Sequence, residues 1–237
     1  MFTENRTPTF TRRRLLWLAG GTGAGLVLTA CGGSTSSDGD AATTSGTSPD
    51  CVLTPEQIEG PFYTSDRDLR GDITDDRDGV SLELILTVVA AGSCRPLQDA
   101  TVDVWHADAA GLYSAFEGQG DDADVDTTAA TFLRGAQTTD EQGTVEFRTI
   151  YPGWYPGRTT HVHVKVRFDD QTQVTSQLYF PDDISAEVYE QPAYRDRGSK
   201  DTPNVSDDFG GDEADLQLTV TATGDGYLAT HTLGIEG

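Results

Sequence analysis

The 237-residue chain is poor in positive charge and in histidine. It contains 16 Lys and Arg residues against 39 Asp and Glu, a formal net charge of −23, and it has only 4 histidines. A surface this acidic repels nucleic acid and anionic membranes, which excludes both as partners of the folded part. The sequence also lacks a P-loop, a glycine-rich dinucleotide fingerprint, a CxxC pair and a GxSxG motif. The chemistries that these motifs carry are therefore not indicated.

Long hydrophobic runs are scarce as well, and the one near the N-terminus indicates an export signal. This apolar run, 15–30, follows three arginines, 12–14, as in the twin-arginine pattern. It is shorter than the roughly 20 apolar residues that a membrane-spanning helix needs. Residues 1–30 are therefore predicted to be a twin-arginine signal. Cys31 follows a sequence that resembles a bacterial lipobox, which makes the predicted signal a lipoprotein type. An ordinary secretory signal with a chance cysteine is the alternative.

Composition divides the rest of the chain into a tether and a domain. Residues 31–50 are almost all Gly, Ser, Thr, Ala and Asp, which cannot bury a core, so a flexible tether is predicted. Residues 51–237 have the length of one domain and contain most of the short apolar runs. We expect an exported protein that is anchored to the outer face of the cell membrane only through a lipid on Cys31.

The two remaining cysteines, Cys51 and Cys94, are predicted to pair. Disulfides persist in exported domains, where the surroundings are oxidising. Such a bridge would join the start of the domain to the loop after its first long strand. Two unpaired thiols are the alternative.

Alternating apolar and polar residues predict about seven short strands and little helix. The strands are expected at 80–89, 101–106, 132–137, 144–150, 161–168 and 173–180, with a closing hairpin of 216–223 and 227–234. Helical turns are expected only near Thr54 and at 183–190, and long loops at 108–126 and 191–211. This pattern is typical of an all-β, antiparallel β-sandwich with long loops and little helix.

A candidate metal site begins at His161 and His163. Side chains two apart on a strand point to the same face, so both imidazoles project from one face while the intervening valines pack on the other. Tyr155 lies in the Pro/Gly turn just before them, and Tyr113 lies in the loop after an earlier strand. A phenolate is a hard, anionic donor that suits Fe(III), and a trivalent cation would hold it deprotonated at neutral pH. The sequence therefore indicates ferric iron bound by tyrosine and histidine.

Several segments together resemble the intradiol ring-cleavage dioxygenases, the family of protocatechuate 3,4-dioxygenase and catechol 1,2-dioxygenase. Three of them are similar to the family's iron-ligand motifs: Val102–Tyr113, Pro152–Pro156 and Arg158–His163. Further support comes from Gly60–Phe62, Phe132–Gly135, Thr149–Ile150 and Ser176–Phe180. The resemblance spans about residues 54–182, and the motifs occur in the family's order.

The resemblance implies that Tyr113, Tyr155, His161 and His163 bind one mononuclear, non-haem Fe(III) per chain, without an organic cofactor. Tyr155 would leave the metal when substrate binds. Arg158 would lie near the bound catecholate, and Gln177 in the same pocket. The implied reaction cleaves a catechol-type diol with O2 between its two hydroxylated carbons to a cis,cis-muconate-type diacid.

The spacing around the second tyrosine departs from the family pattern. Only five residues separate Tyr155 from His161, fewer than in the soluble catabolic enzymes. That segment helps to form the substrate pocket of the family, so the sequence leaves the particular catechol open, along with the oligomeric state.

Two other function classes remain open at this point. A non-catalytic β-sandwich lipoprotein, serving in binding or adhesion, has no reason to keep all four ligand residues. A cupin-type metal enzyme also uses His-x-His, but needs a Glu about four residues later and a further His. Arg167, Phe168 and the distant His231 do not supply these. His106 is predicted to be structural or close to the site, and His231 to be unrelated to it.

Overall fold

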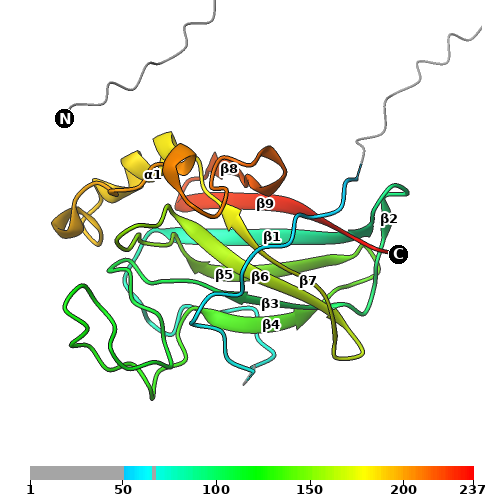
Figure 1. Ribbon diagram of the computed structural model, residues 1–237, viewed down its shortest axis with the longest axis horizontal. Helices are drawn as coiled ribbons and strands as arrows, with labels where there is room; N and C mark the ends of the chain where they lie inside the picture. Colours follow the sequence, from blue (N-terminus) through cyan, green and yellow to red (C-terminus); the bar gives the residue numbers. More distant parts are fainter. Residues whose placement is uncertain (1–50, 66–67) are drawn as a thin grey trace, which may run out of the picture. The chain divides into compact units, whose positions relative to one another are not determined.

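The computed structural model describes residues 51–65 and 68–237. The predicted signal (1–30), the tether (31–50) and Cys31 lie outside these residues. The described chain forms two β-sheets and contains one α-helix (Figure 1). The predicted all-β sandwich with long loops and little helix is therefore confirmed. None of the helices in the described part is long and apolar enough to cross a membrane.

The first sheet is built around its longest strands. It contains β1 (Ser81–Ala90), β2 (Arg95–Pro96), β5 (Thr144–Ile150), β8 (Thr219–Ala222) and β9 (Gly226–Ile235). β5 pairs with one side of β1 and β9 with the other. The β1–β9 pair is parallel, whereas the other pairs of named strands are antiparallel. Parallel neighbours need a long connection, and nearly the whole domain lies between these two strands.

The second sheet has the order β4 (Arg134–Thr138), β3 (Thr101–Trp105), β6 (His161–Phe168) and β7 (Gln171–Tyr179). These strands agree closely with the predicted ones, because each keeps a clear alternation of apolar and polar residues. β2 occupies a segment that has no such alternation and was not predicted as a strand.

The core lies between the two sheets and follows from the period of two in their strands. Every second residue of β1 and β6 enters one buried cluster: Leu82, Leu84, Leu86, Val88, Val162, Val164 and Val166. Burying each of these side chains contributes about 1.5–3 kcal/mol. The alternate residues of β6 must therefore lie on the opposite face of its sheet, where the candidate metal site was predicted.

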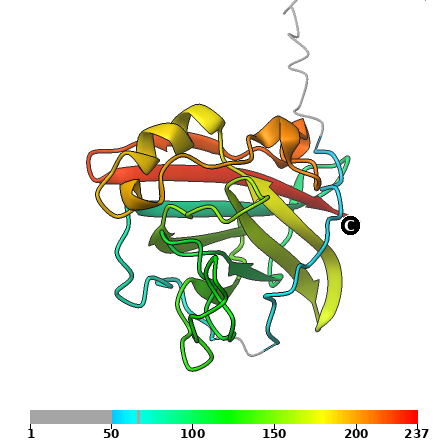
Figure 2. The same cartoon turned by 60° about the vertical axis from the view of Figure 1, so that its left-hand side comes forward.

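The segment after β7 packs against the first sheet. α1 (Asp182–Tyr189) confirms the predicted helical turns, and three short 3-10 helices follow: η1 (Arg195–Arg197), η2 (Asn204–Ser206) and η3 (Ala214–Leu216). Figure 2 shows α1 and the following loop beside β9 and β8. Three of its side chains, Val188, Tyr189 and Tyr194, belong to the buried cluster. The long loop predicted at 191–211 is thus packed onto the domain.

The segment before β1 is extended, so the helical turn expected near Thr54 was wrong. The Thr54 amide donates to the Gly234 carbonyl at 2.8 Å, and the Gln57 amide to the Thr175 carbonyl at 2.9 Å. These long-range bonds to β9 and β7 satisfy the backbone groups that a helix would have paired locally. Residues 54–63, blue in Figure 1, form what we call the N-terminal strap.

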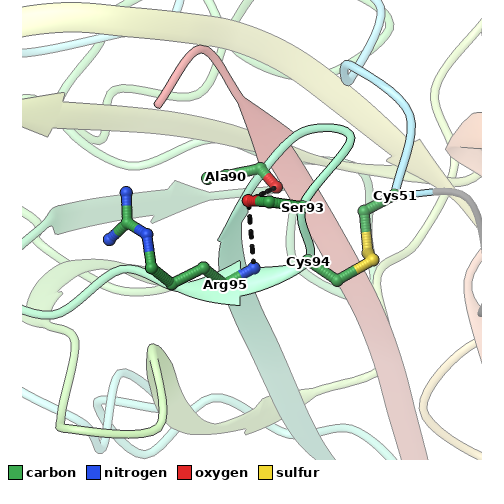
Figure 3. Close-up of a disulfide and its surroundings, with 5 residues drawn as sticks. All are labelled: Cys51, Ala90, Ser93, Cys94 and Arg95. Carbon is green, nitrogen blue, oxygen red and sulfur yellow. Dashed lines mark hydrogen bonds between the residues drawn. A yellow bond between two sulfur atoms is a disulfide. The ribbon is translucent and has the colours of Figure 1, made fainter.

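Cys51 and Cys94 form a disulfide, which confirms the predicted pairing. Figure 3 shows the bridge between the start of the described chain and the loop joining β1 to β2. In that loop the Ser93 hydroxyl donates to the Ala90 carbonyl at 3.4 Å, and the Gly92 amide donates to the Cys51 carbonyl at 2.7 Å. The disulfide therefore fixes the chain just before the N-terminal strap.

Replacing both cysteines by serine (Cys51→Ser with Cys94→Ser) should lower the free energy of unfolding. The bridge joins two residues that are 43 apart in sequence. Because it lowers the conformational entropy of the unfolded chain, a bridge across a loop of this length stabilises the folded state by about 4 kcal/mol. Urea denaturation of the oxidised protein and the variant measures the difference. The wild-type protein under reducing conditions should match the variant; a loss below about 1 kcal/mol would contradict the expectation.

Candidate metal centre

β6 presents His161 and His163 on the face of its sheet opposite the core, as the alternation predicted. The strand register places Trp105 of β3 on one side of His163 and Gln177 of β7 on the other. The Trp105 and His163 rings stack, with centroids 4.9 Å apart and planes inclined by 8°. Both histidines are buried, at 3% and 2% exposure, because the strap and two loops cover this face.

The two predicted tyrosines both reach His161. The Tyr113 and Tyr155 hydroxyl oxygens lie 3.3 Å and 3.2 Å from His161 Nε2. His161 Nδ1 lies 2.7 Å from the Thr159 carbonyl oxygen. Because a carbonyl only accepts, Nδ1 carries the proton and Nε2 presents its lone pair. The ring of His163 is 4.9 Å from that of His161, so the structure brings all four predicted side chains together.

The loops that carry the tyrosines pack against each other through glycine. At Gly111, where φ is +81°, a Cβ would lie 2.4 Å from the Trp154 carbonyl oxygen. At Gly153 a Cβ would lie 2.4 Å from the Asp108 carbonyl oxygen, to which the Gly153 amide donates at 3.0 Å. Only glycine allows such close approach. The spacing between the two phenols therefore depends on these two positions.

Arg134 holds the Tyr113 loop in place. Its Nε donates to Ser114 Oγ at 2.7 Å, its Nη2 to the Ser114 carbonyl at 2.6 Å and its Nη1 to the Phe62 carbonyl at 3.2 Å. The Phe62 ring stacks on Tyr113, with centroids 4.5 Å apart. Burial lowers the pKa of Arg134 to about 10, so the guanidinium stays charged at neutral pH. Tyr113 is thus enclosed between the strap and a fixed cation.

Arg158 and Gln177 meet beside Tyr155, where they were predicted to form part of the pocket. Arg158 Nη2 donates to Gln177 Oε1 at 2.5 Å, and Arg158 Nη1 lies 3.5 Å from the Tyr155 hydroxyl. Arg158 Nε donates to Asp207 Oδ2 at 2.8 Å. The Gln177 amide nitrogen donates to the Ile58 carbonyl of the strap at 3.2 Å. The guanidinium is therefore oriented from several sides.

Burial favours the neutral forms of all four converging side chains. It raises the pKa of Tyr113 well above its usual range, with a further contribution from Tyr155. It also raises the pKa of Tyr155, although Arg158 opposes this. Burial, with Arg158 adding to it, lowers the pKa of His161 to about 3, and burial together with His161 lowers that of His163 well below its usual value. Neutral imidazole is the form that binds metals.

These residues fit a metal ion. His163 Nδ1 is buried without a hydrogen-bond partner among the described residues, so no hydrogen bond holds the ring at that nitrogen. Two phenol oxygens also compete for the one lone pair on His161, and a cation among them would replace that competition with direct bonds. No group of three His, Cys, Asp or Glu side chains in residues 51–65 and 68–237 could hold a metal. A metal here therefore needs the tyrosines as ligands.

The other two histidines, His106 and His231, have separate partners. His106 contacts the Thr149 hydroxyl and the Ala107 carbonyl through its two ring nitrogens, at 2.7 Å and 2.8 Å. His231 lies in the other sheet, and its Nδ1 is 3.2 Å from the Gln217 carbonyl. These contacts agree with a structural role for His106 and with the separation of His231 from the site.

Sequence reasoning missed two contributors to the site, Asp207 and Arg134. Asp207 lies in a loop rich in Asp, Gly and Arg, where nothing in the local pattern distinguishes it from its neighbours. Arg134 belongs to one of the segments that resemble the family, but the sequence assigned it no partner. Its burial next to a tyrosine loop becomes visible only once β4 is placed beside β3.

Comparisons with known proteins agree with this fold and site. A family model described as "Dioxygenase" matches residues 58–195. Catechol 1,2-dioxygenase 1 of Acinetobacter lwoffii is 28% identical over 215 residues, which cover 77% of this chain and 67% of that protein. Chlorocatechol 1,2-dioxygenase of Cupriavidus pinatubonensis is 32% identical over 143 residues, which cover 52% of this chain and 53% of that protein.

A solved structure has a similar fold. The intradiol ring-cleavage dioxygenase from Tetranychus urticae superposes with a TM-score of 0.69 at 30% identity, covering 78% of this chain and 95% of that one. A β-sandwich in which two tyrosines and two histidines converge is the arrangement that the resemblance implied. The chain belongs to the intradiol ring-cleavage dioxygenase family, whose members are oxidoreductases. It spans about half to two thirds of the length of the curated relatives that it matches.

Acid should destabilise the protein through its buried histidines. Burial lowers the pKa of His106 from 6.5 to about 4, so the unfolded chain takes up a proton at a higher pH than the folded one. Stability is then complete above pH 6.5 and falls as the pH drops toward 4, by about 3 kcal/mol for this residue. Urea unfolding of wild type and His106→Gln at pH 7 and pH 4 measures the slope. The variant should lose about that much less on acidification; equal slopes would remove His106 as a cause.

Proposed function

We propose that this chain is a non-haem Fe(III) intradiol dioxygenase that cleaves a catechol-type diol between its hydroxylated carbons. The observation that carries the proposal is the convergence of two phenols, one buried and one partly buried, on the lone pair of a buried, neutral imidazole, with a second such imidazole beside it. A binding module has no use for this arrangement. The family and its curated relatives support the same reaction class.

Tyr113, Tyr155, His161 and His163 would hold one ferric ion per chain. Two phenolates offset two of its three positive charges, and two neutral imidazoles complete a set that leaves room for a bidentate substrate. Bound here, Fe(III) would supply a Lewis-acidic centre on which a catechol is held as its dianion and made reactive toward O2. The reaction inserts both oxygen atoms, turning catechol and O2 into cis,cis-muconic acid without an external reductant.

The two tyrosines differ in how firmly the chain holds them. Tyr113 is 1% exposed and is enclosed by Phe62 and the loop that Arg134 fixes. Tyr155 is only partly buried and is followed by the exposed residues Pro156 and Gly157. Its hydroxyl already lies 3.5 Å from Arg158 Nη1. Tyr155 is therefore suited to leave when substrate binds, because Arg158 Nη1 can donate a hydrogen bond to the freed phenol oxygen.

Arg158 and Gln177 would act on the substrate itself. A fixed guanidinium beside the reacting ring stabilises negative charge that develops there, and it needs no reorganisation when burial has already oriented it. The amide of Gln177 keeps the guanidinium in that orientation. Trp105 and the strap exclude water from the His163 side of the site.

The purified, iron-loaded protein should be reddish, because tyrosinate-to-Fe(III) charge transfer absorbs visible light. Replacing Tyr155 by phenylalanine should weaken the colour and lower O2 uptake with catechol at least ten-fold, as loss of one metal ligand removes both. Iron content, the visible spectrum and an oxygen electrode give the three readings. Tyr227→Phe, which alters a tyrosine in the other sheet, is the matched control.

Unchanged turnover in the Tyr155→Phe protein would remove this residue from the metal site. A colourless, iron-free wild-type protein that consumes no O2 with any catechol would overturn the proposed reaction. If the wild-type protein does consume O2 with a catechol, a panel of catechols with different ring substituents would identify the preferred substrate.

We also propose export and lipid anchoring at Cys31. The Cys51–Cys94 bridge supports this, since disulfides persist outside the reducing cytoplasm. Cys31→Ser should move the protein from the membrane fraction to the soluble exported fraction, as read by immunoblotting of cell fractions. An unchanged membrane fraction would argue against the lipid.

A further inference from the structure

Asp207 has no role in the proposed chemistry so far, yet its side chain contacts Arg158 and Thr159, which border the site. It follows η2 in the loop after α1, outside residues 58–195 that the family model matches. Its side chain is 0% exposed. A buried carboxylate is costly unless it is paired and hydrogen-bonded, so its partners indicate why it is there.

The carboxylate has partners from two segments. Oδ2 accepts from Arg158 Nε at 2.8 Å and from the Thr159 amide at 3.0 Å. Oδ1 lies 3.4 Å from Arg158 Nη2 and accepts from the Phe209 amide at 3.0 Å. One oxygen of Asp207 therefore binds both the Arg158 side chain and the backbone amide of Thr159, the residue after that arginine. The guanidinium carbon of Arg158 lies over the Phe209 ring, 4.4 Å from the ring centroid.

Through Thr159 the same carboxylate reaches His161. The Thr159 carbonyl accepts from His161 Nδ1 at 2.7 Å and so fixes which ring nitrogen faces the tyrosines. Arg158 and Thr159 are consecutive, so a single anchor at Asp207 sets the guanidinium beside Tyr155 and the carbonyl behind His161. A shift of this loop would move both together.

Asp207 also cancels the charge of the arginine. Arg158 is 11% exposed in its side chain, and its ion pair with Asp207 leaves no net charge at this wall of the pocket. The nearby Lys200 is likewise paired, with Asp182 at 2.5 Å. Gln177 and Phe209, which also contact the guanidinium, are uncharged, and the Tyr155 hydroxyl lies 3.5 Å from Arg158 Nη1. The wall therefore offers a substrate carboxylate hydrogen bonds but no net positive charge.

We propose that Asp207 is a positioning residue that holds Arg158 beside Tyr155 and, by cancelling its charge, makes the site favour uncharged catechols over carboxylated ones. The inference rests on the proposed dioxygenase function and names the substrate class of that site. Removing the negative charge leaves an unpaired guanidinium, which attracts a carboxylate and no longer keeps its place next to the phenol.

The test compares Asp207→Asn with wild type as full-length, iron-loaded proteins. Asparagine keeps the size and the carbonyl acceptor but loses the charge. Initial rates with catechol and with 3,4-dihydroxybenzoate give kcat and KM for each, and iron content and the visible spectrum are recorded without substrate. We expect kcat with catechol to fall at least ten-fold. The ratio of kcat/KM for the carboxylated substrate to that for catechol should rise at least five-fold, with iron and colour retained.

The neighbouring residue provides the control. Asp208 is exposed, and Asp208→Asn removes the same charge from the surface while leaving Arg158 paired. It should keep the wild-type ratio. A ratio within two-fold of wild type in the Asp207→Asn protein overturns the inference, including the case in which both substrates slow equally, because that is the signature of a merely structural residue.

A second variant decides the matter if Asp207→Asn does not fold. The double variant Asp207→Asn with Arg158→Gln has no unpaired charge, so it should fold and bind iron if Asp207 acts through Arg158. Failure of the double variant as well would overturn the inference.

Failure of the proposed function itself would be distinct, because the wild-type protein would then consume no O2 with either catechol. Thermal unfolding of the metal-free proteins still tests the pairing in that case. The double variant should lose less stability than the sum of the two single variants; additive losses would show that the residues are not coupled.

Discussion

The period of two along β6 is the constraint on which the rest of the site depends. Val162, Val164 and Val166 belong to the core between the sheets, and this fixes the register of the strand. A slip by one residue would turn His161 and His163 into that core and the valines toward the strap and the loops on the other face. The free energy that keeps the two histidines on the face opposite the core is therefore hydrophobic. It comes from valines that do not contact the site.

The same alternation explains how much could be predicted from the sequence. The shared face of the two histidines follows from spacing alone, and the two tyrosines and Arg158 follow from resemblance to a family. The parallel β1–β9 pair and the extended strap could not be predicted, because both depend on partners more than a hundred residues away in sequence. Asp207 could not be identified either, because an aspartate in a polar loop looks solvated until its arginine partner, 49 residues earlier, is placed beside it.

Each of the two tyrosines has an arginine nearby, and the two arginines differ in their hydrogen-bond partners. Arg134 is held by uncharged oxygens of Ser114 and Phe62 and keeps its positive charge close to Tyr113. Arg158 is neutralised by a carboxylate and lies beside Tyr155. Burial raises the pKa of both phenols, and Arg158 opposes this rise at Tyr155. The two phenols therefore have different surroundings, although their hydroxyls lie at similar distances from the same imidazole.

The strap and the loop after α1 border the site together, although they are far apart in the sequence. Gln57 of the strap binds the Phe209 carbonyl across 152 residues of sequence, and Thr54 binds Gly234 across 180. Contacts between such distant residues form late, because the loop-closure entropy must be overcome first. A chain still emerging from the ribosome has its tyrosines and histidines before it has the loop that encloses them. Completion of the pocket must therefore wait until the last part of the domain has been synthesised.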